Sequence, residues 1–286
     1  MKRISLYFAA VISAAFAMCS CQPTGDDIVL ELVKDDPSAL LYTCDRQTVK
    51  IKMNSNRSWK ASCTEEWIEI ETTKGSDGED QLFRFILFAN PGYTYRTGEI
   101  VIKAGDRNLV LTVTQEPEIQ YLVKENFNDD NLLVEKALPS GWTSIDLDKD
   151  GFGWRCWRNE ETEQAYAYSA SYDSYDGDLS PDNYMLTPIF RIPAQGFYVR
   201  WDAMGSDAEY LGDKYEVWVA AYKSDSPLVY LKKLCEEVTE SATELTHHEY
   251  MLDDYVDISL CIVFRHFDSV GRSRVLITNV EITNSR

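Results

Sequence analysis

Three aspartates stand at alternate positions in a stretch that is rich in glycine and tryptophan. Asp146, Asp148 and Asp150 are followed directly by Gly151. Carboxylates at positions 1, 3 and 5 of a loop, with glycine at position 6, can turn their oxygens toward one hard cation, together with a carbonyl oxygen at position 7. Phe152 supplies that carbonyl. We therefore interpret Asp146, Asp148, Asp150 and Phe152 as candidate ligands of a structural calcium ion.

The loop departs from the helix–loop–helix type of calcium site. Position 12 of that type is a bidentate Glu. In this chain Trp157 stands there, and neither flank has the apolar period of a helix. Calcium takes about 6 to 8 oxygen ligands, so the remaining oxygens would come from elsewhere in the fold or from water. The alternative interpretation is a solvated Asp and Gly turn between two strands.

Aromatic residues near this loop offer surfaces for a sugar ring. Trp154 and Trp157 flank Arg155, while Tyr172 and Tyr175 lie in a polar stretch. An aromatic face can stack on a pyranose ring while neighbouring charged groups bond its hydroxyls. We take Trp154, Trp157, Tyr172 and Tyr175 as candidate ligand-binding residues. Packing in the core is the alternative for the two tryptophans.

Catalytic motifs are missing from the sequence. It contains no Gly-x-Ser-x-Gly elbow, phosphate-binding loop or His-Glu-x-x-His motif. Because there are 47 acidic residues, some pair of carboxylates will stand at a glycosidase spacing by chance, and such a pair carries no signal. We expect His247 and His248 on opposite faces of a strand, and His266 buried and hydrogen-bonded. The prediction is that the protein is not an enzyme.

The N-terminal residues have the pattern of a secretory signal. Two cationic residues precede an apolar run, residues 4–18, that is too short for a comfortable membrane span. The small residues before Cys21 resemble the lipobox of bacterial lipoproteins. We predict a signal peptide over residues 1–20, acylation of Cys21 and an acidic tether over residues 21–30. The resemblance implies a lipid anchor in the outer membrane, with the chain exposed at the cell surface.

Composition limits the class of partner and the role of cysteine. The formal net charge of −19 disfavours nucleic acid and anionic membrane surfaces as partners, and is compatible with divalent cations and neutral or cationic ligands. Hydrophobic residues make up 44% of the chain, enough for the cores of two domains. The cysteines after Cys21 are odd in number and form no Cys-x-x-Cys pair, so no disulfide framework is expected. Cys44 and Cys63 are the one pair that an oxidising compartment would join.

Residues 31–117 alternate between apolar and polar positions in short strands separated by turns. A family resemblance rests on Trp59-Lys-Ala-Ser, Glu66-Trp67-Ile-Glu-Ile, Asn90, Arg96-Thr-Gly-Glu-Ile-Val-Ile and Val110-Leu-Thr-Val-Thr-Gln115. These pieces resemble the BACON domain, which implies a small immunoglobulin-like sandwich. Members of that family were proposed to bind carbohydrate and many behave as spacers, so both roles stay open. We expect Trp59 and Trp67 in the core.

Residues 119–286 also read as strands, about eight to ten of them, which predicts a jelly-roll β-sandwich. One of the predicted strands runs from Tyr184 to Phe190. The chain as a whole is therefore predicted to be all-β, with an immunoglobulin-like sandwich followed by a jelly-roll β-sandwich. Long acidic loops separate the strands of the second half, and such loops are where binding usually resides in a rigid sandwich.

The second half carries a resemblance of its own. It rests on Glu125-Asn-Phe, Leu138-Pro-Ser-Gly-Trp142, the loop 146–154, Pro181-Asp-Asn-Tyr-Met-Leu-Thr-Pro188, Ser206-Asp-Ala-Glu-Tyr210 and Ile277-Thr-Asn-Val-Glu-Ile282. These pieces resemble the cleaved-adhesin family of gingipain haemagglutinin modules and the related choice-of-anchor J domains. The resemblance implies a calcium-binding, adhesive β-sandwich and adds Asp207 as a further calcium ligand. Asn279 stands where family members often carry Asp, so a cation site built from Glu125 and the last strand would be weaker.

These observations predict a non-catalytic cell-surface lipoprotein. It would bind a glycan or a host glycoprotein through a calcium-stabilised β-sandwich. Two alternatives stay open, namely a structural subunit of an outer-membrane assembly and a glycan-degrading enzyme of the sandwich class.

Overall fold

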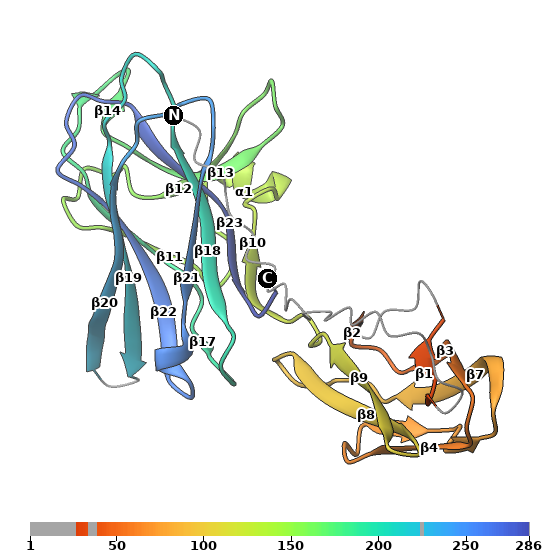
Figure 1. Ribbon diagram of the computed structural model, residues 1–286. Coiled ribbons are helices and arrows are strands. Elements are labelled where there is room, and N and C mark those ends of the chain that lie inside the picture. The colour runs from red at the N-terminus through yellow and green to blue at the C-terminus, as the bar shows by residue number, and fades with distance from the viewer. Residues whose placement is uncertain (1–26, 34–38, 224–225, 286) are drawn as a thin grey trace. The chain divides into compact units, whose positions relative to one another are not determined.

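The structure is a computed structural model, and it describes residues 27–33, 39–223 and 226–285 (Figure 1). The signal peptide predicted over residues 1–20 and the acylation site Cys21 lie outside these residues. In the described part, the only helices are α1 (Asp130–Glu135) and the short 3-10 helix η1 (Asp253–Tyr255), and every other regular element is a β-strand. The predicted all-β class, an immunoglobulin-like sandwich followed by a jelly-roll sandwich, is confirmed.

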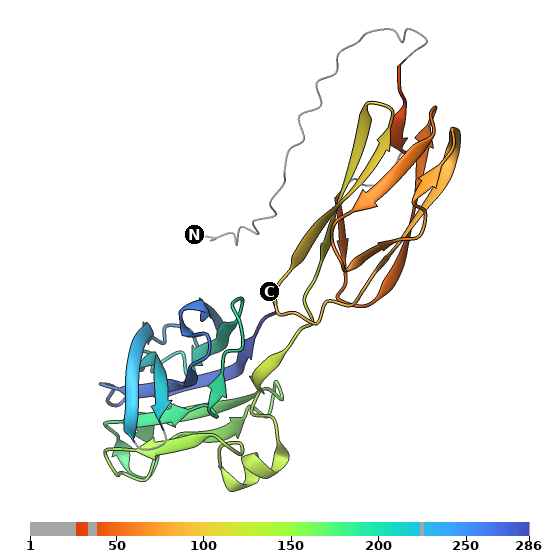
Figure 2. The same ribbon diagram turned by 90° about the horizontal axis from the view of Figure 1, so that it is seen from below.

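The N-terminal strands form two sheets. The first has four strands in the order β1 (Leu30–Leu32), β3 (Gln47–Ser55), β7 (Gly78–Leu87) and β5 (Ile68–Ile70). The second has five strands in the order β2 (Ala39–Tyr42), β9 (Arg107–Gln115), β8 (Arg96–Ala104), β4 (Trp59–Cys63) and β6 (Lys74–Gly75). In Figure 2 these red-to-yellow strands run lengthwise in two layers.

Strict alternation along these strands places every second side chain in the core. On β7, the side chains of Phe83, Phe85 and Leu87 are fully buried. The ring of Trp59 is buried against Phe83, with the centroids 5.9 Å apart in an edge-to-face arrangement. The core role expected of Trp59 is thus confirmed, whereas Trp67 is only half-buried.

Three polar residues of the BACON-like motif tie the strand ends together. Nε and Nη2 of Arg96 donate to Oε1 of Gln115 at 3.0 and 2.7 Å. Nε2 of Gln115, a buried side chain, donates to the carbonyl oxygens of Cys44 and Asp45. Nδ2 of Asn90 similarly donates to backbone carbonyl oxygens. These contacts give the motif residues a structural role, because they satisfy backbone groups that turns leave without partners.

The C-terminal strands form two larger sheets, in which all pairings are antiparallel. One contains β12 (Arg155–Arg158), β13 (Ala165–Ala170), β23 (Arg274–Thr283), β18 (Tyr198–Gly205) and β21 (Thr246–Met251) in that order, with β10 (Tyr121–Glu125) paired to β23. The other contains β11 (Thr143–Asp146), β16 (Asp182–Leu186), β22 (Ser259–Phe267), β19 (Lys214–Lys223) and β20 (Ser226–Val238), with β17 (Phe190–Arg191) paired to β22. A small hairpin, β14 (Tyr172–Asp173) and β15 (Gly177–Asp178), projects separately.

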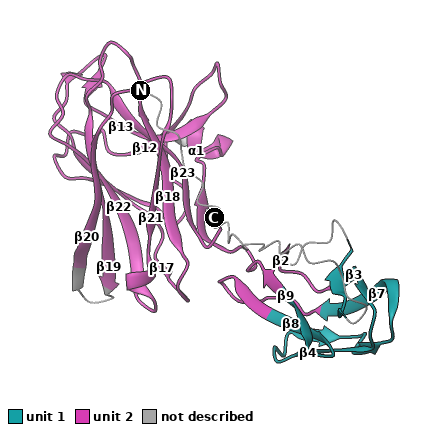
Figure 3. Cartoon of the chain, viewed as in Figure 1, with its two compact units in different colours: residues 1–38, 48–86, 99–111 teal, residues 39–47, 87–98, 112–286 magenta. Residues whose placement is uncertain are grey.

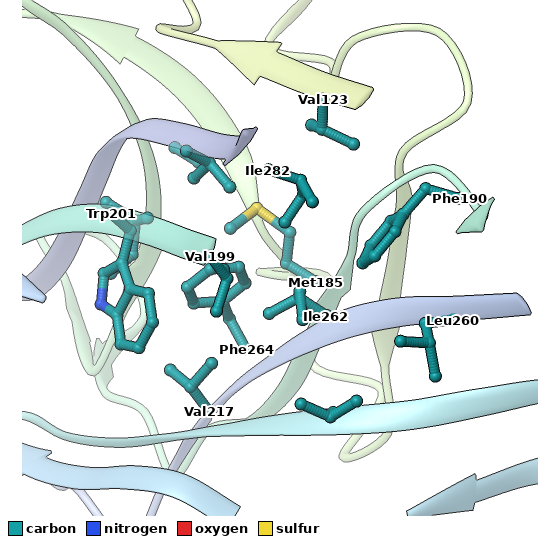
Figure 4. Packing of buried hydrophobic residues seen from close by; sticks show 14 of the residues in the cluster. Val123, Met185, Phe190, Val199, Trp201, Val217, Leu260, Ile262, Phe264 and Ile282 are labelled. Atoms are coloured by element: carbon teal, nitrogen blue, oxygen red, sulfur yellow. The ribbon is translucent and has the colours of Figure 1, made fainter. Parts of the chain in front are cut away.

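The core of this sandwich lies between the inner faces of the two sheets. Figure 4 shows Trp201 and Val199 of β18 facing Phe264 and Ile262 of β22, with Met185 of β16 among them. The ring centroids of Trp201 and Phe264 lie 5.6 Å apart and nearly perpendicular. Alternation along each strand therefore fixes which face of each sheet meets the other.

Some elements differ from the sequence expectation. The strand predicted from Tyr184 to Phe190 is two strands, β16 and β17, because Pro188 lies between them and has no N–H for the ladder. Helix α1 was not predicted; its N-cap is Asp129, whose side chain accepts a hydrogen bond from the backbone N–H of Asn131. Cys44 and Cys63 are free thiols, so the disulfide considered for them is not formed.

The chain divides into two compact units (Figure 3). Among the described residues, 27–33, 48–86 and 99–111 belong to one unit, and 39–47, 87–98, 112–223 and 226–285 belong to the other. Within the described residues, strands β1–β9 pair only among themselves, and β10–β23 do likewise. The domain limits 31–117 and 119–286 stay predictions.

Candidate functional site

The aspartate loop joins β11, which ends at Asp146, to β12. Oδ1 and Oδ2 of Asp146 accept hydrogen bonds from the backbone N–H groups of Lys149 and Gly151 at 2.7 and 2.8 Å. Both donors have positive φ, 65° and 84°, and glycine adopts this conformation without steric cost. The loop thus curls over the carboxylate at its start.

The other two carboxylates of the loop also accept backbone N–H groups. Oδ1 of Asp148 accepts from Asp150 at 3.1 Å, and its Oδ2 accepts from Asp182 at 2.5 Å. Oδ1 of Asp150 accepts from Phe152 at 2.7 Å. Because Asp182 is the first residue of β16, Asp148 fastens the loop to the neighbouring strand.

The structure brings the three aspartates together. One carboxylate oxygen from each of Asp146, Asp148 and Asp150 lies within 4.8 Å of the others. Partial burial raises the pKa of Asp150, and the negative charges of Asp148 and Asp146 raise it further, although the N–H of Phe152 opposes the shift. Three converging carboxylate oxygens are hard ligands of the kind that calcium takes.

Two residues beside the loop face the interior of the sandwich. The carbonyl oxygen of Phe152 lies 3.4 Å from Nδ2 of Asn183, a buried side chain of β16. Trp154 is only 2% exposed, and its Nε1 donates to the carbonyl oxygen of Asn183 at 3.0 Å. A ring buried in this way cannot stack on a sugar, so the predicted ligand-binding role of Trp154 is wrong and its role is in the core.

Trp157 and the two candidate tyrosines are more open. Trp157 is half-buried, and one of its ring faces stacks on Tyr166 with the centroids 6.0 Å apart. Tyr172 is 45% exposed and Tyr175 is 96% exposed. Both tyrosines lie on the β14–β15 hairpin, Tyr172 in strand β14 and Tyr175 in the turn between the two strands.

Asp207 lies away from the three-aspartate cluster. It is not among the carboxylates that converge with Asp146, and its Oδ1 accepts the backbone N–H of Glu209 at 2.9 Å. It lines a separate pocket with Tyr172 and Tyr210. Asp207 is therefore a residue of this polar pocket. Its role as a calcium ligand stays a prediction from the sequence.

Asn279, on strand β23, has a local structural role. Asn279 adopts a positive φ of 49°, and its Nδ2 donates to Oδ2 of Asp202 at 2.7 Å. A carboxylate in its place would repel Asp202 instead of donating to it. Glu125, the other residue considered for a cation site here, uses Oε1 to accept the N–H of Phe127.

Asp213 is a buried carboxylate on which distant segments meet. Its Oδ1 accepts from Oγ of Ser171 at 2.5 Å, and its Oδ2 accepts from the backbone N–H of Ser273 at 3.2 Å. Oδ1 also lies 3.1 Å from Nε2 of His266, whose Nδ1 lies 2.9 Å from Oγ of Ser169. The buried, hydrogen-bonded state predicted for His266 is confirmed. Sequence reasoning missed Asp213, because its partners are 42 to 60 residues away along the chain.

Ser169, His266 and Asp213 are the residue types of a hydrolase triad. Their side chains are all buried, so a substrate could not reach Oγ of Ser169. That hydroxyl is also held by Nδ2 of Asn183 at 3.2 Å. This set therefore has a structural role, and it supplies no nucleophile.

Two protein-family models match parts of the chain. Residues 125–282 match the model of the Cleaved Adhesin Domain, and residues 57–116 match BACON, described as a putative binding domain, N-terminal. The first match covers more than half of the chain and includes β10–β23 nearly in full.

Individual relatives come from Porphyromonas gingivalis. The chain is 26% identical over 186 residues to Hemagglutinin A, an alignment that spans 57% of this chain and 8% of that protein. It is 29% identical over 132 residues to Lys-gingipain W83, spanning 44% of this chain and 7% of that protein. The chain thus spans less than a tenth of the length of these relatives.

Among solved structures, two adhesin domains of Lys-gingipain from the same organism are similar to it. The K3 cleaved adhesin domain is 24% identical with a TM-score of 0.47, covering 58% of this chain and 98% of that one. The K1 domain is 25% identical with a TM-score of 0.46, covering 56% of this chain and 96% of that one. On the family match over residues 125–282, the chain belongs to the cleaved adhesin domain family.

Proposed function

We propose that this chain is a lipid-anchored protein of the bacterial cell surface whose C-terminal sandwich binds a glycan or a glycoprotein. The observation that carries the proposal is the match of residues 125–282 to the cleaved adhesin domain. Relatives named Hemagglutinin A and Lys-gingipain align with 57% and 44% of the chain, and the name hemagglutinin denotes a protein that agglutinates red cells. Adhesion is thus the activity that the family favours for this domain.

The anchor rests on the sequence alone. Cys21 follows a short apolar run and a serine, and lies before the first described residue. In the described part of the chain, no helix is long and apolar enough to cross a bilayer. An acyl chain contributes about 0.8 kcal/mol of binding free energy for each buried methylene, and two or more chains give a stable anchor.

A calcium ion is proposed to rigidify the loop between β11 and β12. Asp146, Asp148 and Asp150 would hold it, since their oxygens already converge and the pKa of Asp150 is raised by burial and by its acidic neighbours. The ion would neutralise the repulsion among the three carboxylates and supply no reaction chemistry. Its expected effect is to stabilise the end of the sandwich formed by this loop and β16.

A non-catalytic role agrees with the geometry of the polar residues. Ser169, His266 and Asp213 are buried. The three carboxylates of the loop between β11 and β12 accept hydrogen bonds from the loop backbone. We therefore propose binding and propose no reaction for the chain.

The first test measures calcium binding and adhesion on the same protein. The chain beginning after Cys21 would be melted with calcium and with chelator, and then applied to a glycan array and to red cells in the more stable condition. We expect calcium to raise the melting temperature and the protein to bind glycans or cells.

Two variants decide where the ion binds. Asp148→Ala should remove most of the calcium shift, because it deletes a carboxylate of the cluster, while Asp254→Ala, an exposed aspartate outside it, should keep the shift. Equal shifts in both variants and in the wild type would reject the calcium assignment. No glycan and no cell binding in either condition would reject the adhesive function itself.

A further inference from the structure

The strongest unassigned feature is a pocket at one end of the C-terminal sandwich, the end where Figure 1 labels β14. The cavity has a volume of about 300 Å³, at the small end of the range for ligand sites. Three segments form it, namely the β14–β15 hairpin, the loop after β18 and the loop before β23. It is lined by Tyr172, Asp178, Asp207, Tyr210, Gly271, Arg272 and Ser273. We call this the tyrosine pocket.

Two exposed aromatic rings line the tyrosine pocket. Tyr172 is 45% exposed and Tyr210 is 53% exposed, so neither ring is needed by the core. Tyrosine presents an apolar face and a polar hydroxyl, and its ring loses little conformational freedom on binding. A flat, partly apolar ligand with hydroxyl groups at its edge suits such a pair.

The pocket also offers both kinds of hydrogen-bonding group. Asp178 and Asp207 are exposed carboxylates, which only accept. Arg272 is an exposed guanidinium with five donors, and among the described residues it has no ion pair. A sugar hydroxyl donates and accepts at once, so it can bond a carboxylate and an arginine together.

Charge selects among sugars. Two carboxylates against one guanidinium leave the pocket net negative, and the whole chain carries −19. An anionic sugar, such as a sialylated or sulfated one, would be repelled by this field. A neutral hexose is the class that fits.

The three segments are held in place before any ligand arrives. The carbonyl oxygen of Ser171 accepts N–H bonds from Leu179 at 2.9 Å and Gly271 at 3.1 Å, which links the hairpin to the loop before β23. Oγ of Ser206 lies 2.6 Å from Oγ of Ser273, which links the loop after β18 to the same place. Preorganised loops reduce the ordering cost of binding.

The buried carboxylate of Asp213 also holds two of the three pocket segments in place. It accepts from Ser171, beside the hairpin, and from Ser273, in the pocket wall. Asp213 is therefore a positioning residue, since it acts on the pocket through the two serines and is itself buried.

From these observations we propose that the tyrosine pocket binds one neutral hexopyranose ring of a glycan. The ring would stack on Tyr172 or Tyr210 while Asp178, Asp207 and Arg272 bond its hydroxyls. The proposal rests on the adhesive function proposed above, and names the ligand class and the site. It also assigns Asp207 to sugar binding.

The test uses the chain beginning after Cys21, with two readouts. A glycan array reports binding of any kind, and saturation-transfer NMR with the methyl glycosides of glucose, galactose and mannose reports contact with a neutral ring. The variants are Tyr172→Ala with Tyr210→Ala, and Arg272→Ala. Tyr175→Ala is the matched control, because Tyr175 lies on the same hairpin, is 96% exposed and does not line the pocket.

We expect neutral glycans among the array hits and saturation transfer to at least one methyl glycoside. The double tyrosine variant and Arg272→Ala should each weaken binding by about tenfold or more, as loss of an anchor residue does, while Tyr175→Ala should not. All the changes are at exposed positions, so the far-ultraviolet circular dichroism and the melting temperature should match those of the wild type.

Other outcomes distinguish a failure of the pocket proposal from a failure of the proposed adhesive function. Array binding that survives in the pocket variants would overturn the pocket and leave the adhesive function standing. Hits confined to sialylated or sulfated glycans would overturn the neutral class. An array and a red-cell assay without any binding would overturn both proposals.

Discussion

Nε2 of His266 lies 3.1 Å from Oδ1 of Asp213, and both side chains are fully buried. The other ring nitrogen of His266, Nδ1, lies 2.9 Å from Oγ of Ser169, so the imidazole bridges Asp213 and Ser169. Ser171 and Ser273 supply the other donors to Asp213. One buried carboxylate thereby connects β13, β22 and β23 to the loop after β18.

Replacing Asp213 by Ala should destabilise the C-terminal sandwich. The change leaves buried donors of His266 and Ser171 without an acceptor, and breaking such a buried set costs about 3 to 5 kcal/mol in free energy of unfolding. Urea unfolding of the chain beginning after Cys21 would measure the loss. Asp207→Ala, at an exposed carboxylate, is the control and should change the free energy by less than about 0.5 kcal/mol. Similar values for the two variants would contradict the structural role of Asp213.

A second prediction concerns pH and Glu216, a buried residue of β19. Burial alone would raise its pKa, but hydrogen bonds from Lys233 at 2.6 Å and Arg265 at 3.1 Å hold the pKa below its ordinary value. A carboxylate with a lowered folded pKa contributes stability that is present above its unfolded pKa of about 4.3. That contribution is lost as the pH falls through the folded pKa.

Glu216→Gln removes this dependence. We expect the variant to be less stable than the wild type by about 1 to 3 kcal/mol at pH 7, and the difference to shrink as the pH falls toward 3. Urea midpoints at pH 7, 5 and 3 would show it, with Glu244→Gln, an exposed residue, as the control. A difference that stays constant or grows on acidification would show that the ion pairs do not stabilise the fold.

A third prediction concerns thiol reactivity. Burial raises the pKa of Cys156 to about 12 and that of Cys261 to about 11, with the negative charges of Glu125 and Asp129 adding to the shift at Cys156. Since the thiolate is the nucleophile, neither cysteine should react with iodoacetamide at pH 8 in the native protein. Peptide mass spectrometry after a short pulse would measure labelling, and the same pulse in guanidinium should label both. Rapid labelling of native Cys156 would show that this part of the sandwich opens.

The sequence predicted the core strands well where alternation was strict. On β3, β7 and β8 the buried residues stand at alternate positions, so the period of two is plain in the chain itself. The strand expected at His247 and His248 is β21, Thr246–Met251, but its bounds could not be predicted, because it is an edge strand with mostly polar, exposed residues. Such a strand is defined by its pairing with β18, and nothing within its six residues indicates that partner.

Some residues of the candidate site could be predicted from the sequence and others could not. Asp146, Asp148 and Asp150 could be grouped from their spacing, because a loop of five residues keeps their oxygens close. Trp154 could not be placed, since whether an aromatic residue faces the core depends on the strand register. The tyrosine pocket joins residues from 172 to 273, and only the folded sheets bring those three segments together.

The last prediction concerns the wall of the tyrosine pocket. Gly271 has a φ of +62°, and a Cβ added there would lie 2.8 Å from Oδ1 of Asp178. Gly177 has a φ of +81° with no atom within 4 Å of such a Cβ, so it carries the same backbone constraint without the contact. Gly271→Ala and Gly177→Ala should each cost about 1 to 2 kcal/mol in free energy of unfolding for the left-handed backbone. Only Gly271→Ala should also push the Asp178 carboxylate away and weaken glycan-array binding, because it alone changes the pocket. Equal loss of binding in the two variants would mean that hairpin stability, and not the position of Asp178, governs recognition.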